Sequence, residues 1–415
     1  MGKKRVVITG LGTINSIGHN VNETWENLLK GKSGIDRIKN FELTDEFSSQ
    51  IAGEVKDFDV TDYLDKKRAK KLDRYSQFAL IASYEAYNDS GLCNFDFDHF
   101  RAGAIISSGI GGMKTFEDEA RKMVEKGPKR ISPFFIPKMI SNIASAEVAI
   151  EFDLKSVNFC ITSACASANH AIGTAFRSIQ YGDADIIFSG GSEASVTPLA
   201  LAGFSAMKAL STRNDEPEKA CRPFDVERDG FIMAEGAGII VLEELEHALK
   251  RNARIYAEIV GYGATCDAYH ITAPAENGEG GARAMLQAIA DAGIKPENID
   301  YINAHGTSTP LNDPNEAIAI KSVFGAHAYE VKINSTKSMI GHTLGAAAAI
   351  EAITCCKSIE NGLIHSTQNL ENPDPNCNLN FASDKNIELN IDYALSNSLG
   401  FGGHNGVLVF RKYQK

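Results

Sequence analysis

The sequence predicts an α/β fold in which two similar halves, each rich in β-α-β units, pack as one rigid body. Apolar segments typical of strands alternate with segments of helical spacing, and the second half repeats the order of the first. No linker rich in Pro, Gly or Ser separates the halves near residues 250–257. We therefore divide the chain into residues 1–255 and 256–415 and expect the loops of both halves to meet at one site.

The composition is typical of a soluble globular protein. Of the 415 residues, 43% are hydrophobic and 23% are charged, and the formal net charge is -11. This charge argues against nucleic acid as the main partner, because nucleic-acid binding needs many basic residues on one face. No apolar run is long enough to span a bilayer, and the start of the chain lacks a signal-peptide pattern. We therefore expect a cytoplasmic protein that does not insert into membranes, with its eight scattered cysteines reduced.

The first half opens with an apolar strand from Val6 that runs into Gly10-Leu-Gly12. A lone GxG is weak evidence for a dinucleotide site, and Asn15 stands where a third glycine would be, so we expect no nicotinamide cofactor. Three elements are predicted next: a helix over 76–87, a buried strand and glycine-rich turn over 102–112, and an irregular aromatic loop over 127–137.

Residues 156–190 predict a strand, a tight turn of small residues, a helix to Gln180 and a second strand, with Cys165 in the turn. A thiol at the start of a helix lies where unpaired backbone N–H groups and the positive end of the helix dipole favour the thiolate. Cys165 is therefore the first candidate for a covalent nucleophile. The alternative is a small cysteine buried in the core, a common role for this residue.

The second half contains a counterpart for each of these strand segments. The matched segments are 257–263 with 6–12, 299–307 with 102–112, 331–359 with 156–180, and 393–403 with 184–191. The third of these segments contains a predicted helix from Thr343 to Ile359. This correspondence predicts that the turns of the second half face the turn that carries Cys165.

Three polar turns follow apolar strands in the second half: residues 303–309 with His305, residues 337–342 with His342, and residues 400–405 with Phe401. Ligands bind beyond the carboxyl ends of strands, so we expect these turns to converge on Cys165. One cysteine with two neutral imidazoles suits attack on a thioester carbonyl while a second carbonyl is polarised. It suits hydrolysis less well, because a cysteine hydrolase normally needs one His oriented by Asn or Asp.

The chain carries six motifs in order: Ser163-Ala-Cys-Ala-Ser, Leu210-Ser-Thr-Arg-Asn-Asp, Arg222-Pro-Phe-Asp-Val-Glu-Arg-Asp-Gly-Phe, Asn303-Ala-His-Gly-Thr-Ser-Thr, Ser335-Thr-Lys-Ser-Met-Ile-Gly-His and Gly400-Phe-Gly-Gly. Together they resemble the β-ketoacyl-[acyl-carrier-protein] synthases of the thiolase superfamily, in particular the elongating enzymes of bacterial type II fatty acid synthesis. The similarity runs from Val6 to Phe410. It implies a thiolase-like fold whose layers follow the order α-β-α-β-α.

The resemblance implies a decarboxylative Claisen condensation. Cys165 would take the acyl chain from acyl carrier protein as a thioester, with the backbone N–H groups of Cys165 and Phe401 forming the oxyanion hole. His305 and His342 would bind the carbonyl of the malonyl thioester and assist the loss of CO2. The resulting carbanion equivalent would attack the acyl group and give a 3-oxoacyl chain on the carrier protein.

The resemblance also implies roles for residues around this set. Lys337 would bias the charge state of nearby groups, and Glu351 would keep its ammonium paired, because an unpaired buried charge is unfavourable. Thr307 and Thr309 match residues that bind the phosphopantetheine arm of the carrier. Phe401 matches a gating residue that swings aside to admit the acyl chain.

Two apolar positions match residues of the acyl pocket. Ile110 lies where the type II branch carries isoleucine at the pocket floor, and Phe134, with its neighbour Phe135, would line the pocket or a dimer contact. The resemblance implies no tightly bound cofactor apart from the phosphopantetheine of the carrier. It allows a structural Na+ or K+ near four residues: Asn303, Glu351, Ser396 and Asn397.

The expected partners are acyl carrier protein, in its acyl and malonyl forms, and a second copy of the chain. Complementary charge would steer the acidic carrier to basic residues although the host protein is acidic overall. The candidate docking residues are Lys66, Lys67, Arg68, Lys129, Arg130 and Lys208.

The chain departs from common family residues at three positions: Ala273 for serine, His404 for threonine and Leu399 for phenylalanine. These departures leave the acyl chain length and the gate kinetics open. Other readings are a non-catalytic subunit of the chain-length-factor type, which lacks the nucleophile, and a polyketide-type ketosynthase. A degradative thiolase would need a second cysteine near the C-terminus, and residues 400–406 contain none.

Overall fold

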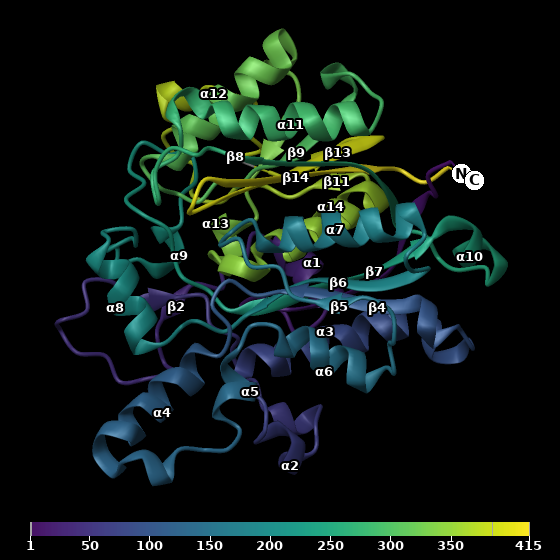
Figure 1. The fold of residues 1–415 in the computed structure, drawn as a ribbon. Coiled ribbons are helices and arrows are strands. Elements are labelled where there is room, and N and C mark those ends of the chain that lie inside the picture. Colours follow the sequence, from purple (N-terminus) through teal and green to yellow (C-terminus); the bar gives the residue numbers. More distant parts are fainter. Residues whose placement is uncertain (1, 384, 415) are drawn as a thin grey trace.

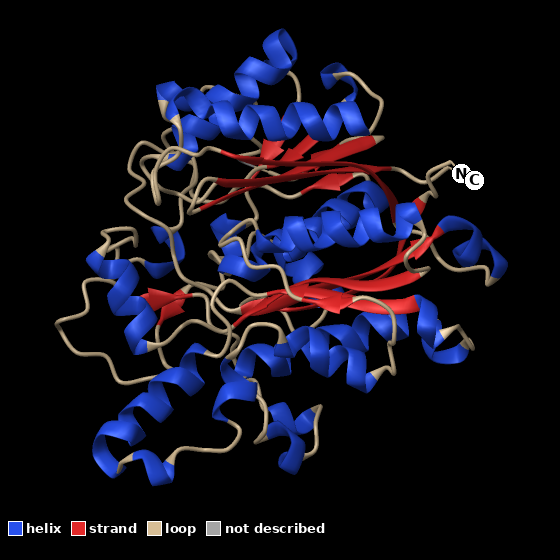
Figure 2. Cartoon of the chain, in the orientation of Figure 1, coloured by secondary structure: helices blue, strands red, loops and turns tan. Residues whose placement is uncertain are grey.

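The computed structural model describes residues 2–383 and 385–414 and shows five stacked layers, in which helices and sheets alternate (Figures 1 and 2). Two sheets lie on either side of a central layer of helices, and each sheet is covered on its outer face by further helices. The layer order α-β-α-β-α expected for a thiolase-like fold is therefore confirmed.

The two sheets have the same strand order, which confirms the duplicated halves. The first half gives β5-β4-β6-β7-β1 and the second gives β10-β9-β13-β14-β8, so that each strand of one half has a counterpart in the other. Antiparallel pairing of β1 with β8, over Val6 to Ile8 and Ala257 to Ile259, joins the two sheets at one edge. The strands are β1 Val6–Ile14, β4 Ala102–Ser107, β5 Asn158–Phe159, β6 Ile186–Glu193, β7 Gly236–Glu244, β8 Ala257–Cys266, β9 Tyr301–Asn303, β10 Lys332–Asn334, β13 Tyr393–Gly400 and β14 His404–Arg411.

The central layer consists of α7 (Ser167–Tyr181) and α14 (Ala347–Asn361), which lie between the sheets (Figure 1). In α14 every residue from Ala347 to Ile359 is buried, because the helix contacts apolar faces on both sides. This packing is possible because small residues dominate its first turn, Ala347-Ala348-Ala349. Each central helix follows one of the turns singled out in the sequence, so the fold points both turns towards the same region.

The Gly10-Leu-Gly12 sequence serves helix packing. A Cβ atom on Gly12 would collide with the carbonyl of Ala82 in α3 (Arg74–Asp89), which covers β1. The second half repeats this contact, since a Cβ on Gly263 of β8 would collide with the carbonyl of Ala284 in α11 (Glu279–Asp291). The paired glycines therefore let α3 lie directly on β1 and α11 directly on β8.

The remaining elements extend the layers or form the rim of the site. The outer helices also include α6 (Ile143–Glu151) on the first sheet and α12 (Asn312–Phe324) on the second. The others are α1 Val21–Leu29, β2 Asp36–Arg37, β3 Ile51–Ala52, α2 Lys66–Ala69, α4 Met113–Lys126, α5 Phe135–Met139, α8 Pro198–Ala206, α9 Pro217–Ala220, α10 Leu245–Lys250, α13 Lys337–Ile340, β11 Leu363–Ile364 and β12 Ile387–Glu388. Among the described residues, no helix combines the length and apolar character needed to cross a membrane.

Two local predictions need correction. The aromatic loop predicted over 127–137 contains a 3-10 turn, Pro128–Arg130, and the start of α5, because Pro128 and the 132–135 turn fix helical geometry there. The helix predicted from Thr343 begins as a 3-10 turn at Leu344 and becomes α14 only at Ala347. Leu344 has a left-handed φ of 47°, which prevents a regular helix at that residue.

Candidate active site

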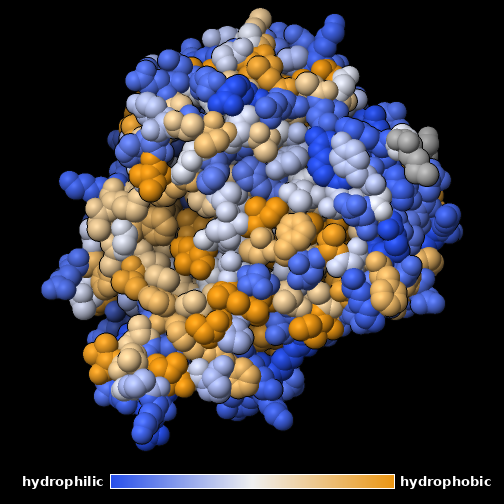
Figure 3. All heavy atoms as spheres, in the orientation of Figure 1, coloured by the Kyte–Doolittle hydropathy of each residue, from blue (hydrophilic) through white to orange (hydrophobic). Residues whose placement is uncertain are grey.

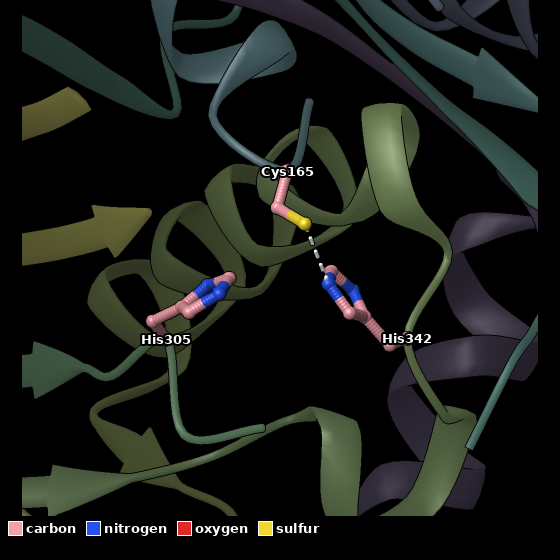
Figure 4. A group of neighbouring side chains, drawn as sticks. All are labelled: Cys165, His305 and His342. Atoms are coloured by element: carbon pink, nitrogen blue, oxygen red, sulfur yellow. Dashed lines mark hydrogen bonds between the residues drawn. The ribbon is translucent and has the colours of Figure 1, made fainter. Parts of the chain in front are cut away.

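Cys165, His305 and His342 converge where the strands of both halves end (Figure 4). Cys165 lies two residues before α7, His305 two residues after β9, and His342 two residues after α13. The sulfur and the imidazole nitrogens of this triad all lie within 4.8 Å of one another. Cys165 Sγ is 3.0 Å from His342 Nε2, and the two imidazole rings are 5.4 Å apart between centroids and nearly perpendicular. The predicted convergence of these turns is thus what the structure shows.

The turn that presents Cys165 is strained and firmly held. Ala164 has a left-handed φ of 51°, a conformation that alanine rarely adopts, and it directs Cys165 into the site. The hydroxyl of Ser398 at the end of β13 donates a hydrogen bond to the carbonyl of Cys165, at 2.7 Å. The backbone N–H groups of Cys165 and Phe401 lie close enough to the thiol sulfur to lower its pKa. An oxyanion formed beside that sulfur would therefore find two donors in place.

The charge state of the thiol differs from the prediction. Burial raises the pKa of Cys165 to about 11, although the ammonium of Lys337 and the N–H of Phe401 act in the opposite direction. The start of α7 does not compensate for the loss of water around the sulfur, so the expectation of a thiolate made by the helix terminus alone is wrong. A pKa this high favours the neutral thiol at neutral pH, and His342 Nε2 is the group within reach of its proton.

The raised pKa of Cys165 predicts how its alkylation depends on pH. Only the thiolate reacts with iodoacetamide, and the thiolate fraction rises about tenfold per pH unit below the pKa. We therefore expect the alkylation rate to climb steadily from neutral pH towards about pH 10, without a plateau. Mass spectrometry of the Cys165 peptide over time measures this rate. A rate that is constant around neutral pH would show a thiolate–imidazolium pair and contradict the neutral thiol.

Both histidines are held by the backbone and are neutral. The N–H groups of His305 and Gly306 donate to the two carboxylate oxygens of the buried Glu316, at 2.8 and 2.9 Å. His342 is held as in a strand, because its N–H donates to Ile232 and its carbonyl accepts from Ala234. Burial lowers the pKa of each histidine well below its usual value, and the positive charge of Lys337 lowers it further. Neutral imidazoles can donate a hydrogen bond to a carbonyl without giving it a full proton.

Lys337 and Glu351 form an ion pair behind the histidines. Both side chains are fully buried, and Lys337 Nζ donates to Glu351 Oε1. The same ammonium lies 3.4 Å from His305 Nδ1. Since an ammonium only donates, Nδ1 of His305 accepts, and the proton of this neutral imidazole is on Nε2. The ion pair therefore fixes the tautomer of His305.

A cavity of about 580 Å³ reaches the triad from the surface. Figure 3 shows apolar residues around a hollow on the left side of the molecule, where the strands of both sheets end in Figure 1. Its walls include most of the predicted substrate residues: Ile110, Thr307, Thr309, Phe401 and, at the departures from common family residues, Ala273 and Leu399. The hydroxyl oxygens of Thr307 and Thr309 are 2.9 Å apart. Enclosed apolar walls with a few convergent polar groups are typical of a ligand site.

Phe134 is not among the residues that line this cavity, and its place in an acyl pocket stays a prediction. Its ring is 43% exposed, and the ammonium of Lys71 lies 5.7 Å from the ring centre. The residue follows a short turn on the surface before α5, which carries it away from Cys165. A place in a dimer contact, the other role predicted for Phe134, remains a prediction.

The basic residues predicted for docking occupy three different settings. Lys208 lines the mouth of the cavity. Lys66, Lys67, Lys129 and Arg130 are exposed on α2 and on the turn after α4. Arg68 pairs with Glu147 and Glu151 of α6. The charge of Arg68 is therefore already paired within the chain, which weakens the prediction that this residue binds acyl carrier protein.

Sequence reasoning missed several buried residues that hold the site. Glu316 orients His305, and Glu193 at the end of β6 accepts the N–H groups of Gly109 and Gly345, which belong to different halves. The one available signal was an acidic residue at the end of an otherwise apolar strand, Ile186–Glu193. The partners of these carboxylates are far away in the sequence and could not be paired from it.

The comparisons agree with this geometry. The family model described as "Beta-ketoacyl synthase, N-terminal domain" matches residues 3–248, and "Beta-ketoacyl synthase, C-terminal domain" matches residues 256–371. The 3-oxoacyl-[acyl-carrier-protein] synthase 2 of Staphylococcus aureus (strain N315) is 52% identical over 411 residues, 99% of each chain. That of Synechocystis sp. (strain ATCC 27184 / PCC 6803 / Kazusa) is 51% identical over 412 residues, also 99% of each chain. The chain belongs to the β-ketoacyl synthase family.

Solved β-ketoacyl synthases and ketosynthases share the whole fold. A ketosynthase of a type II polyketide system, solved with its acyl-carrier protein, gives a TM-score of 0.92 at 38% identity, over 99% of this chain and 100% of that one. A β-ketoacyl synthase from Burkholderia phymatum STM815 gives a TM-score of 0.93 at 34% identity, with the same coverage. The identity is higher to the β-ketoacyl synthases named 3-oxoacyl-[acyl-carrier-protein] synthase 2 than to the polyketide ketosynthase.

Proposed function

We propose that this β-ketoacyl synthase elongates fatty acyl chains: it condenses an acyl group on Cys165 with malonyl-acyl carrier protein. The products are a 3-oxoacyl-acyl carrier protein, CO2 and the free carrier that delivered the acyl group. The observation that carries this proposal is the convergence of Cys165, His305 and His342 at the inner end of one cavity. Relatives that are about half identical over the full chain bear the name of this activity.

In the first half-reaction, Cys165 Sγ forms a bond to the thioester carbonyl of the acyl carrier. The thiol proton passes to His342 Nε2, 3.0 Å away, and the oxygen that gains negative charge is held by the N–H groups of Cys165 and Phe401. The bond to the carrier sulfur then breaks, and that sulfur takes the proton from His342. Phe401, at the tip of the β13–β14 hairpin, acts as the gate to this step.

In the second half-reaction, the imidazole of His342 first moves its proton from Nδ1 to Nε2 by exchange with solvent, since Nε2 no longer faces a thiol. The malonyl carbonyl then accepts hydrogen bonds from Nε2–H of His305 and of His342. The bond to the malonyl carboxylate breaks and releases CO2, and its electron pair forms an enolate that the two donors stabilise. The enolate carbon bonds to the acyl carbon, and the bond to Cys165 Sγ breaks. The thiolate then takes a proton from water. Thr307 and Thr309 bind the phosphopantetheine arm, and Ile110 contacts the acyl chain in the pocket.

The proposal is tested by following both half-reactions separately. Acyl-acyl carrier protein should add one acyl group to the peptide that contains Cys165, as measured by mass spectrometry, and malonyl-acyl carrier protein should then release CO2 and the 3-oxoacyl product. An adduct on Cys160, or acylation without condensation in the wild type, would contradict the proposed reaction.

We expect His305→Ala to separate the half-reactions. His342 rather than His305 hydrogen-bonds the sulfur, so acyl transfer should fall less than about tenfold in His305→Ala. Condensation should fall by about 10²–10³-fold, because one donor to the enolate is lost. Single-turnover acylation and CO2 release measure the two effects. His327→Ala, at a partly buried histidine that does not line the cavity, is the matched control and should change neither rate. Equal losses in both half-reactions would refute the role of His305.

A structural monovalent cation fits next to this site. Each of the four residues expected around the cation has a buried oxygen without a hydrogen-bond partner among the described residues: Asn303 Oδ1, Glu351 Oε2, Ser396 Oγ and Asn397 Oδ1. Ser396 lies directly opposite Asn303 in the pairing of β13 with β9. Oxygen ligands of this kind suit Na+ or K+, and binding to the folded state alone would stabilise it.

We expect KCl or NaCl to raise the melting temperature above that in choline chloride of equal ionic strength. Ser396→Ala, which removes one oxygen without another partner, should reduce the difference. Differential scanning fluorimetry measures it. Equal melting temperatures of the wild type in all three salts would remove the cation from the proposal.

We also propose that acyl carrier protein docks at the cavity mouth beside Lys208, with Lys66, Lys67, Lys129 and Arg130 as further contacts. The similar ketosynthase of a type II polyketide system was solved in complex with its acyl-carrier protein. Charge reversal by Lys208→Glu should raise the KM for the carrier, mainly at low salt. No tightly bound cofactor is needed beyond the carrier's phosphopantetheine.

A homodimer and a cytoplasmic location complete the proposal. The edge strand β5 exposes Phe159 and pairs on one side only, with β4, so a second copy could extend the sheet there. Analytical ultracentrifugation measures the dimer. All eight cysteines are free, which suits a reducing compartment, and cell fractionation tests that location.

A further inference from the structure

One histidine outside the triad links the two segments that supply the oxyanion N–H groups. His170, in the first turn of α7, contacts Ser163 Oγ through Nδ1 at 2.6 Å and the carbonyl oxygen of Asn405 through Nε2 at 3.2 Å. A carbonyl only accepts, so Nε2 carries the proton and Nδ1 accepts from the hydroxyl of Ser163. Ser163 comes two residues before Cys165, and Asn405 four residues after Phe401.

The chain makes room for this imidazole. A Cβ atom on Gly406 would lie 2.9 Å from His170 Cδ2, so glycine at that position of β14 lets the ring reach the hairpin. The adjacent Asn169 donates to the carbonyls of Ser396 and Gly406, one on each strand of the hairpin. The first turn of α7 is therefore hydrogen-bonded to both strands of the hairpin. Only residues 401–403, which include the proposed gate Phe401, form the loop between these strands.

We propose that His170 is a positioning residue that fixes the distance between the N–H groups of Cys165 and Phe401. The inference rests on the proposed acyl transfer, in which those groups hold the oxyanion. The two donors come from opposite halves of the chain. His170 connects both segments directly, through one hydrogen bond to each. Without this bridge, the Phe401 loop and the Cys165 turn would be free to shift relative to each other. One of the two N–H groups would then no longer be positioned to donate a hydrogen bond to the oxyanion.

A purely structural role for His170 makes a different prediction. The ring also packs near Tyr262 and His404, with centroids 6.3 and 6.4 Å away. If packing were its only role, a substitution would affect every reaction of Cys165 through general loosening of the turn. If it positions the oxyanion donors, only reactions that form an oxyanion should slow. Alkylation by iodoacetamide forms none, so the two readouts separate the roles.

The test compares His170→Ala, His170→Asn and His170→Gln with the wild type. Asn places its amide near the position of Nδ1 and can still meet Ser163, whereas Gln reaches towards Asn405. We expect kcat for acyl transfer to fall about tenfold or more in His170→Ala and less in the other two, with KM for the acyl carrier changed less than about twofold. The alkylation rate of Cys165 should stay within about twofold of the wild type in all three. His99→Ala, at an exposed histidine, is the matched control.

Ser163→Ala supplies a second, independent variant. On its own, Ser163→Ala should lower the rate of acyl transfer. Added to His170→Ala, it should lower that rate little further, because both substitutions break the same hydrogen bond. Unchanged kcat in His170→Ala, or equal losses of acyl transfer and alkylation in all folded variants, would overturn the positioning role. If the wild type itself transfers no acyl group, the proposed function fails, and this inference fails with it for that separate reason.

Discussion

Cys165→Ala is expected to lower acyl transfer and condensation by at least about 10⁴-fold, the scale seen when an enzyme loses its covalent nucleophile. No other thiol can replace it: within the described residues, only Cys165 has its sulfur beside His342 and the N–H of Phe401. Discontinuous assays with acyl- and malonyl-acyl carrier protein measure the loss.

The same variant should still decarboxylate malonyl-acyl carrier protein, because His305, His342 and Lys337 keep their positions. Cys160→Ala is the matched control. Its sulfur is only half-buried and contacts Thr162 rather than either histidine, so this variant should condense at the wild-type rate. Condensation that persists in Cys165→Ala, or is lost in Cys160→Ala, would show that a different thiol carries the acyl group.

Lys337→Met is expected to destabilise the fold by about 3–5 kcal/mol, because it leaves the carboxylate of Glu351 buried without its partner. Condensation should also fall, since the proton of His305 would no longer be fixed on Nε2. Urea unfolding, followed by circular dichroism, measures the stability. The unfolding midpoint should shift while the slope stays constant.

The double variant Lys337→Met with Glu351→Gln separates these effects. Removing the second charge should recover most of the lost stability, because a neutral amide is far easier to bury than a carboxylate. It should not recover condensation. If the single and the double variants are equally stable, the ion pair does not act as a coupled unit, and the explanation given for the stability loss is wrong.

The duplicated architecture was readable from the sequence because each half carries its own complete series of strands. The Gly10-Leu-Gly12 pair shows the limit of such reading. It resembles part of a nucleotide fingerprint, but its glycines allow α3 to pack closely against β1. The matching contact between Gly263 and α11 in the second half shows that this role is structural. Which helix lies over a glycine depends on the packing of distant segments, and a local motif does not contain that information.

The residues of the candidate site could be predicted from the sequence, but the charge state of its thiol could not. Cys165, His305 and His342 lie in short turns with recognisable sequences, and the strand order brings the turns together. The pKa of Cys165 depends instead on how much water the surrounding layers exclude, and its direction was predicted wrongly. The surroundings of Arg68 and Phe134 could not be predicted for a similar reason, since their neighbours Glu147 and Lys71 come close to them only in the folded chain.

The matching of the two sheets has a consequence for the chemistry of the site. The unit of strand, turn and central helix occurs twice, once with Cys165 before α7 and once with His342 before α14. A protein with two identical copies would place the same side chain at both turns. The two matching turns of this chain carry different side chains, the thiol of Cys165 at one and the imidazole of His342 at the other. The site is therefore chemically asymmetric although its two halves match in structure, because one turn supplies a thiol and the other an imidazole.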